Sequence, residues 1–386
     1  MRIRYFCHYD KLTGYGRAAR DYCGALVGQD LELEIVPLGA APGTVPTSPE
    51  PRYAELDRLV TTEPVGTADV AIYHSLPRVL AVLAADWSAQ EATRRIALTT
   101  WETSRFPDVH AQPIARGYDQ IVVPSSFCQD ALAESGVPSA IIPHCFDPGF
   151  WVPTRAGELS TPLRFYTIGA WAERKNPLGV LAAYLHAFTS ADNVQLVMFH
   201  QGCDFDAVRS LLARTGVPQS ELPELHVPET ELSEQQLLEL HDQADCFVSA
   251  TRCEGFGLGM FEAAIMGRYV ITPIYGGHED FLLDYEGCLE VPYQRTPCFG
   301  SEKKGDVIER DGQKLQVARV ALAPGVTCRQ SWAEPDLIAL ADRMRELYQG
   351  SWRDVAGGIR EDRLALEARF GYSSVGRLFA DFCKEL

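Results

Sequence analysis

The stretch that most constrains the fold of this chain runs from Ser249 to Gly267 and reads SATRCEGFGLGMFEAAIMG. A strand-like run, DCFVSA at 245–250, leads into it, and the apolar residues after the glycines predict a helix that ends near Gly267. Strand, glycine turn and helix form the repeating unit of doubly wound α/β proteins. Gly255, Gly257 and Gly259 permit left-handed backbone, and a helix N-terminus offers unpaired N–H groups. The pattern therefore predicts an anion site, most naturally for phosphate.

Composition limits the kinds of protein that this chain can be. Its 386 residues are enough for two domains, and 46% hydrophobic with 23% charged residues is ordinary for globular proteins. The formal net charge of -17 disfavours a nucleic-acid interface or attraction to an anionic membrane. The first residues do not resemble a signal peptide, no apolar run is long enough to span a membrane, and the eleven cysteines lack metal-ligand spacing. We therefore expect a cytoplasmic protein with reduced thiols and no bound metal. The oligomeric state stays open.

Strand-like and helix-like segments alternate along most of the chain, with a break near 147–157 that is rich in proline and glycine. Before the break we expect a tight turn at 14–16, strands at 2–9, 31–38, 70–77, 95–103 and 120–127, and helices at 17–27 and 128–135. After it we expect strands at 163–168, 194–199, 245–250 and 269–273, and helices at 178–188, 205–215 and 233–243. An exposed insertion is expected at 297–314, and helices starting at 332, 353 and 373 end the chain.

The central stretch resembles the donor site of retaining glycosyltransferases of family 4, which have the GT-B fold. The family pattern is Glu-Gly-Phe-Gly-Leu, a second glutamate eight positions after the first, and an apolar helix ending in glycine. Glu254 and Glu262 match the two glutamates. The resemblance implies two Rossmann-like α/β/α domains facing each other across a cleft. It implies an acceptor-binding domain at 1–150, a nucleotide-sugar donor domain at 151–365, and a C-terminal helix at 366–386 that crosses back to the first domain.

The resemblance also implies roles for individual residues. Glu262 is expected to accept hydrogen bonds from the two ribose hydroxyls, since a carboxylate can take two donors. Glu254 is expected to bind the sugar and to support positive charge at its anomeric carbon. Lys175 corresponds to the family's phosphate lysine, but Ala170 replaces the arginine that usually precedes it. We expect the remaining diphosphate and sugar contacts to come from Arg174, Arg252, Gly255, Phe256, Gly257, Leu258, Gly259 and Gly16.

Further candidates follow strands or turns elsewhere in the chain. His74 is a candidate catalytic residue, and Glu102 and Asp280 are candidate contacts to the sugar or acceptor. His74 and Lys175 also have plainer interpretations. A single histidine after a strand is usually structural, and Lys175 without the family pattern is a solvated turn residue.

The resemblance implies a retaining, metal-independent hexosyltransferase without a cofactor. Its donor is a UDP- or GDP-sugar, and its acceptor is a soluble small molecule or saccharide. The alternatives are a nucleotide-sugar 2-epimerase on the same fold and a non-catalytic sugar-nucleotide binding protein. A nicotinamide dehydrogenase fits less well, because the turn at Gly14-Tyr-Gly16 lacks the third glycine or alanine of the dinucleotide pattern.

Overall fold

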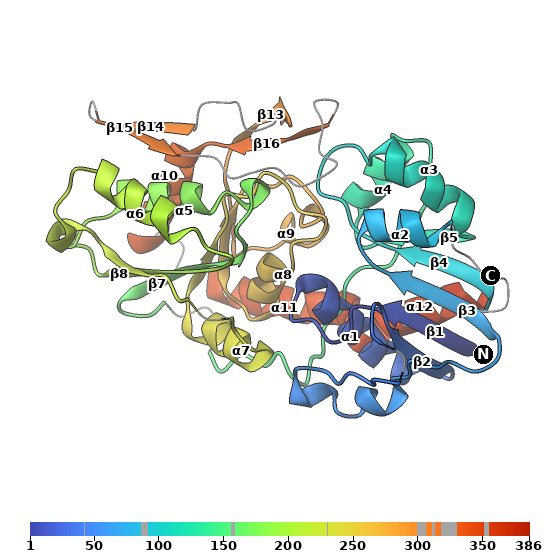
Figure 1. The fold of residues 1–386 in the computed structure, drawn as a ribbon. Coiled ribbons are helices and arrows are strands. Elements are labelled where there is room, and N and C mark those ends of the chain that lie inside the picture. The colour runs from blue at the N-terminus through green and yellow to red at the C-terminus, as the bar shows by residue number, and fades with distance from the viewer. Residues whose placement is uncertain are drawn as a thin grey trace. The chain divides into compact units, whose positions relative to one another are not determined.

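The computed structural model describes residues 1–41, 43–85, 92–155, 159–229, 231–298, 306–310, 313–317, 330–350 and 355–386. The chain divides into two compact units (Figure 1). The first consists of Met1–Val152 with Ala365–Leu386, and the second of Pro153–Leu364. Residue ranges 1–150 and 366–386 were expected to belong together, with 151–365 as the second domain.

The first unit is built on six parallel strands in the order β2-β1-β3-β4-β5-β6. The strands are β1 (Arg2–Cys7), β2 (Glu32–Pro37), β3 (Ala68–His74), β4 (Ala92–Leu98), β5 (Gln120–Val123) and β6 (Ala140–Ile141). Its helices are α1 (Gly14–Val27), α2 (Pro77–Leu83), α3 (Asp108–Gly117), α4 (Ser126–Ala133) and α12 (Tyr372–Lys384), and short 3-10 turns occupy Pro51–Tyr53 and Leu56–Leu59.

Helices cover both faces of this sheet, because side chains alternate between the faces along each strand. Tyr5 belongs to a core that includes Leu26 of α1 and Phe379 of α12. Phe6, the next residue, belongs to the opposite core with α2, α3 and α4. Helix α12 packs closely on α1, since a Cβ on Gly376 would lie 2.2 Å from the Ala25 carbonyl oxygen. The predicted return of the C-terminal helix to the first domain is thereby confirmed.

The second unit has six parallel strands in the order β12-β11-β10-β7-β8-β9. The strands are β7 (Leu163–Ala170), β8 (Val194–Gln201), β9 (Glu224–His226), β10 (Cys246–Val248), β11 (Tyr269–Thr272) and β12 (Cys288–Glu290). Its helices are α5 (Pro177–Ala187), α6 (Phe205–Arg214), α7 (Glu234–Gln243), α8 (Leu258–Ile265), α9 (Glu279–Leu282), α10 (Leu337–Tyr348) and the first part of α11 (Ala356–Phe370), with 3-10 turns at Glu173–Lys175 and Gln219–Glu221. Strand order reverses between β7 and β10, as in the dinucleotide-binding fold.

Two local predictions were wrong, and two helices were missed. The Gly14–Gly16 segment is not a tight turn but the first turn of α1, capped by the Thr13 hydroxyl. The segment 332–335 does not begin a helix, because Ser331–Pro335 is a strand, β16, paired antiparallel with β13 (Tyr293–Pro297). Helix α10 begins only after Asp336, whose side chain caps it. Helices α2 and α3 were not predicted.

The predicted insertion at 297–314 lies partly outside the described residues. In its described part, β14 (Asp306–Arg310) pairs antiparallel with β15 (Gln313–Val317). This pair lies beside α5 and α6.

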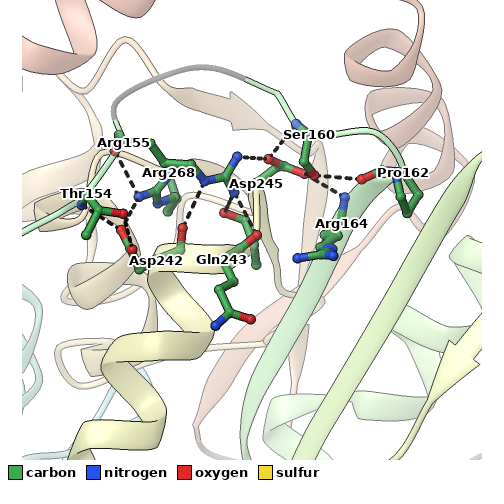
Figure 2. Close-up of polar contacts among 10 residues, drawn as sticks. Thr154, Arg155, Ser160, Pro162, Arg164, Asp242, Gln243, Asp245 and Arg268 are labelled. Carbon is green, nitrogen blue, oxygen red and sulfur yellow. Dashed lines mark hydrogen bonds and ion pairs between the residues drawn. The ribbon is translucent and has the colours of Figure 1, made fainter.

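Two aspartates at the end of α7 anchor the segment that leads from the unit boundary to β7 (Figure 2). Asp245, whose side chain is fully buried, accepts hydrogen bonds from the Arg155 guanidinium at 2.8 Å, the Ser160 amide at 2.9 Å and the Arg164 amide at 2.7 Å. Asp242 accepts from the Thr154 amide at 2.8 Å. Arg155 also donates to the backbone carbonyls of residues 242–244, which have no partner within the helix because they lie at its C-terminal end. The lead-in segment is therefore an integral part of the second unit.

Candidate functional site

The candidate site lies in the second unit, at the carboxyl ends of β7 and β10. These strands are neighbours on either side of the reversal in strand order, which is where ligands bind in open α/β sheets. The chain after β7 supplies Lys175, and the chain after β10 supplies Glu254. A small pocket here is lined by Thr167, Ile168, Lys175, His200, Phe247, Ser249, Glu254, Gly257, Gly259 and Met260.

Glu254 is held by two cations. Lys175 Nζ lies 2.6 Å from its Oε1, and Arg174 Nη1 lies 2.9 Å from its Oε2. The Thr251 hydroxyl donates to Oε1 at 3.0 Å. Burial alone raises the pKa of the Glu254 carboxyl, but the charges and hydrogen bonds of Arg174 and Lys175 outweigh it and lower the pKa to about 2. The site at neutral pH therefore contains a buried carboxylate between two cations.

The backbone of Glu254 is fixed by the glycine pair that follows β11. Glu254 forms an isolated parallel bridge with Gly276, and the Gly277 amide donates to the Glu254 carbonyl at 2.7 Å. Gly276 has a φ of 133°, and a Cβ on it would lie 2.6 Å from that carbonyl oxygen. Only glycine fits here without displacing Glu254, because both the dihedral angle and the space exclude a side chain.

Gly257 places the N-terminus of α8 at the pocket. It is the N-cap residue and has left-handed backbone, with φ at 95°. Of the three glycines expected to have positive φ, this is the one that does; Gly259 lies inside α8, where a Cβ would be 3.0 Å from the Phe247 ring, and Gly255 lies buried in the turn. The first turn of α8 thus presents backbone N–H groups beside Lys175.

Lys175 and Arg174 owe their position to a 3-10 turn between β7 and α5. The turn ends at Asn176, which has left-handed backbone at φ 48° and caps α5 by accepting from the Gly179 amide at 3.2 Å. Pro177 starts the helix, a position that suits proline. Arg174 also donates to the Cys253 carbonyl at 2.5 Å, which ties this turn to the loop after β10.

Arg252 does not line the pocket, contrary to the expected diphosphate contact. Its side chain is 1% exposed and donates to both carboxylate oxygens of Glu334, from Nε at 3.0 and 3.1 Å and from Nη2 at 2.7 Å. Nη1 donates to the Glu173 carbonyl. These contacts connect the loop after β10 with β16, so Arg252 stabilises the loop that carries Glu254 without lining the pocket.

Glu262 lies on α8 and is 4% exposed. Its Oε2 is 3.3 Å from Nε2 of His241 on α7. Two further residues of the motif lie outside the pocket lining: Phe256 packs in an aromatic cluster with Phe261 and Phe281, and Leu258 is partly exposed. Asp280, which follows the motif on α9, also lies outside the pocket lining.

The remaining candidates belong to the first unit. His74 is buried at the end of β3, and its Nδ1 lies 3.0 Å from the Tyr5 hydroxyl. Burial, with smaller contributions from His144 and His8, holds the pKa of His74 well below its ordinary value, so the imidazole is neutral. Glu102 is partly exposed after β4. At Gly16, an added Cβ would lie 2.1 Å from the Lys11 carbonyl, so close packing explains this glycine.

His200, which was not predicted as a site residue, ends the apolar part of β8 and lines the pocket. Its Nδ1 lies 3.4 Å from the Ala170 carbonyl and its Nε2 lies 3.3 Å from the Thr167 hydroxyl. Burial, together with the charge of Lys175, lowers the pKa of His200 to about 4 despite the hydrogen bond to Ala170. A polar residue after an apolar strand was the available signal, and it is the one that identified His74.

Solved structures resemble the chain along its whole length. The Anabaena protein HepE in complex with UDP has a TM-score of 0.65 at 13% identity, with 100% of both chains covered. Sucrose-phosphate synthase from Thermosynechococcus elongatus has a TM-score of 0.66 at 13% identity, covering 100% of this chain and 98% of that one. The lipopolysaccharide outer core galactosyltransferase WaaB has a TM-score of 0.61 at 12% identity, with 100% of both chains covered.

These similarities show that the chain has the GT-B fold, which confirms the predicted fold class. No protein-family model and no curated protein sequence matches the chain. Within the part of the chain that the structure describes, no helix combines the length and apolar character needed to cross a bilayer. Among the same residues, no three histidine, cysteine or carboxylate side chains are grouped as metal ligands.

Proposed function

We propose that this chain is a retaining glycosyltransferase of family 4 that transfers a hexose-type sugar from a nucleotide diphosphate to a small-molecule or saccharide acceptor. One observation carries the proposal. Arg174 and Lys175 meet the Glu254 carboxylate at the reversal in strand order, beside the N-terminus of α8. Cations and helix N–H groups at this edge of the sheet suit a diphosphate, and a carboxylate among them suits the hydroxyls of an attached sugar.

The chemistry requires stabilisation of a leaving group. The bond between C1 of the sugar and the diphosphate oxygen breaks with its electron pair on that oxygen, the acceptor oxygen bonds to C1, and the acceptor hydroxyl gives its proton to the leaving diphosphate oxygen. Negative charge grows on the diphosphate, where Lys175, Arg174 and the first N–H groups of α8 would stabilise it. Glu254 would support the positive charge at C1. These fixed charges fill the role that a metal ion has in other transferases, so we propose that no metal is needed.

The remaining roles are part of the same proposal. Glu262 binds the ribose hydroxyls through its carboxylate. The first unit takes the acceptor. His74 is its candidate catalytic residue, and Gly16 is a candidate contact to the donor sugar or diphosphate. Glu102 and Asp280 are candidate contacts to the acceptor or the sugar. HepE was solved in complex with UDP, which favours UDP over GDP as the leaving nucleotide here.

The proposal is tested first by nucleotide binding. Thermal unfolding is followed with UDP, GDP, ADP, TDP, CMP and NAD, each with and without a chelator. A ligand at about a hundred times its Kd stabilises the folded state by about 2.7 kcal/mol, enough to raise Tm by a few degrees. We expect UDP to raise Tm equally with and without chelator. A folded protein whose Tm responds to none of the diphosphates contradicts the proposal.

Incubation with the UDP-sugar then separates the candidate activities. Sugar transferred to an acceptor from a panel of small saccharides, with retained anomeric configuration by NMR, supports the transferase. A changed sugar without acceptor indicates the 2-epimerase. Binding without either reaction indicates a sugar-nucleotide binding protein.

A further inference from the structure

Glu262 is one end of a buried chain of three side chains from three elements. His241, in the last turn of α7, has its Nε2 3.3 Å from Glu262 Oε2, and its Nδ1 lies 2.6 Å from the hydroxyl of Tyr166 on β7. Tyr166 and His241 are 0% exposed, and Glu262 is 4% exposed. Direct hydrogen bonds thus connect the central strand of the sheet to the helix that begins at the pocket.

The chemistry of the three groups sets the direction of these hydrogen bonds. A carboxylate oxygen can only accept, so Nε2 of His241 carries the proton that is donated to Glu262. In a ring that carries its one proton on Nε2, Nδ1 is an acceptor, and the Tyr166 hydroxyl donates to it. Burial raises the pKa of Tyr166 well above its ordinary value, so this hydroxyl keeps its proton. Glu262 therefore selects the histidine tautomer, and the Tyr166 hydroxyl, which can donate or accept, satisfies the Nδ1 that this tautomer leaves as an acceptor.

Packing fixes the plane of the imidazole. The Phe247 ring is parallel to it, with centroids 6.5 Å apart and an interplanar angle of 12°, and the Tyr166 ring meets it edge to face at 5.2 Å and 85°. His241 occupies a buried position on the face of α7 that also carries Leu237. An apolar side chain would fill such a position at a lower desolvation cost, so the polar contacts of the histidine need an explanation.

We propose that His241 is a positioning residue that holds one oxygen of Glu262 so that the other is directed at the ribose hydroxyls of the nucleotide. The inference rests on the proposed function of Glu262. A carboxylate that is free to rotate would lose part of its binding energy in being ordered when the diol binds. One that is already held by Nε2–H loses less. Tyr166 acts one step further away, as the hydrogen-bond partner of Nδ1 of His241.

The test compares two nucleotides that differ only in the ribose hydroxyls, UDP and 2′,3′-dideoxy-UDP, and the same pair of guanosine nucleotides. Their Kd values are measured by calorimetry, with pyrophosphate as a probe of the Lys175 site alone. For the wild type we expect the Kd of the dideoxy nucleotide to be about 10- to 100-fold higher, the range for hydrogen bonds to a charged group. The ratio of the Kd of the dideoxy nucleotide to that of UDP measures the contribution of the ribose hydroxyls. Glu262→Gln should reduce this ratio to within about threefold of one.

His241→Gln and His241→Asn form a matched pair. Both carry the same amide, but only glutamine is long enough to place an N–H group where Nε2 of histidine lies. We expect His241→Gln to keep most of the ratio and His241→Asn to lose it, with pyrophosphate affinity unchanged in both. Tyr166→Phe, which removes the hydrogen-bond partner of Nδ1 of His241, should fall between them.

The outcomes separate this inference from the function on which it rests. If the Glu262→Gln variant keeps the wild-type ratio, Glu262 does not bind the ribose and the proposed role fails, whatever the His241 variants do. If Glu262→Gln loses the ratio and His241→Asn keeps it, the ribose role stands and the positioning role of His241 is wrong. Equal losses for both nucleotides and pyrophosphate in His241→Asn also contradict positioning, because they indicate general damage to the fold.

Discussion

Lys175 Nζ lies 2.6 Å from Glu254 Oε1, so the cation that should bind a diphosphate is already paired with the carboxylate that should face the sugar. Arg174 is paired with the other oxygen in the same way. A diphosphate that enters the site has to share these cations with Glu254. Binding of the anion is therefore linked to a loosening of the Glu254 ion pairs, which would leave the carboxylate available to the hydroxyls of the sugar.

This competition predicts an unusual effect of Glu254→Gln. The substitution removes the internal competitor for Arg174 and Lys175 and keeps the size of the side chain. We expect the Kd of UDP to stay the same or to fall by up to about tenfold, while turnover of the UDP-sugar falls by about a hundredfold or more. Calorimetry and steady-state kinetics measure the two effects. A UDP affinity that weakens in step with turnover would show that Glu254 does not compete for the cations.

Lys175→Ala should affect the phosphates and not the nucleoside. We expect the Kd of UDP to rise by about 10- to 100-fold and that of uridine to change by less than about twofold, because the lost interaction is with the anion. Lys384→Ala, which changes an exposed lysine paired with Asp381 in the first unit, is the matched control. Equal losses for UDP and uridine would contradict a phosphate contact.

The ion pairs of Glu254 predict a pH dependence of stability. The pKa of Glu254 is about 2 in the folded chain, below its ordinary value of 4.5, so its contribution is complete above about pH 4.5 and is lost as the pH falls towards 2. Glu254→Gln should therefore lower Tm at pH 7 and lower it progressively less as the pH falls below about 5. Asp206→Asn, at an exposed ion pair, should show little difference from the wild type at either pH. A constant Tm difference from pH 7 to pH 3 would contradict the low pKa.

Gly276→Ala should damage the site through the backbone of Glu254. The added Cβ would lie 2.6 Å from the Glu254 carbonyl oxygen, and alanine would be strained at the φ of 133° that Gly276 adopts. Gly202 also has positive φ, at 75°, but has open space around it. We expect Gly202→Ala to cost about 1 kcal/mol of stability from strain alone. Gly276→Ala should lower Tm further and reduce turnover at least tenfold. Equal effects of the two substitutions on turnover would contradict this role of Gly276.

Arg252→Ala separates a supporting residue from a ligand. Removal of the guanidinium leaves the Glu334 carboxylate without its cation at a mostly buried position, and we expect a loss of about 3–5 kcal/mol in the free energy of unfolding. The UDP Kd of the folded fraction should change less than about threefold. Arg209→Ala, at an exposed ion pair, should cost less than about 0.5 kcal/mol. If the variant had wild-type stability but no longer bound UDP, Arg252 would be a contact to the diphosphate after all.

The fold was predictable where local signals agree with the tertiary structure. Pro177 and Ser233 mark helix starts that the structure confirms, Ser233 as part of a capping box with Gln236. The failures have a common cause. Trp332 lies in a strand because its segment pairs with β13, a contact that no local pattern reveals. The same holds for Arg252, whose role is decided by Glu334, 82 residues further along the chain.

The residues of the candidate site could be selected from the sequence pattern, but the contacts between their side chains could not. The spacing of Glu254 and Glu262, and the turn with Lys175, could be read from the sequence because each lies directly after a strand or inside one helix. The ion pair between Lys175 and Glu254 joins turns from two different strand ends, and His241 reaches Glu262 from a separate helix. Such pairings depend on strand order, which alternating segments alone do not specify.

The anchoring of the lead-in segment by Asp242 and Asp245 bears on how such units are inherited. A recombination event that joined a foreign first unit at Leu163, the start of β7, would discard Arg155 and Ser160 and leave the buried Asp245 carboxylate without the donors of these two residues. A crossover near Pro153, where the two units divide, keeps both residues with Asp245. Residues that belong to no helix or strand thus set the N-terminal limit of the second unit, and a chain spliced at its first strand should be less stable than one spliced near Pro153.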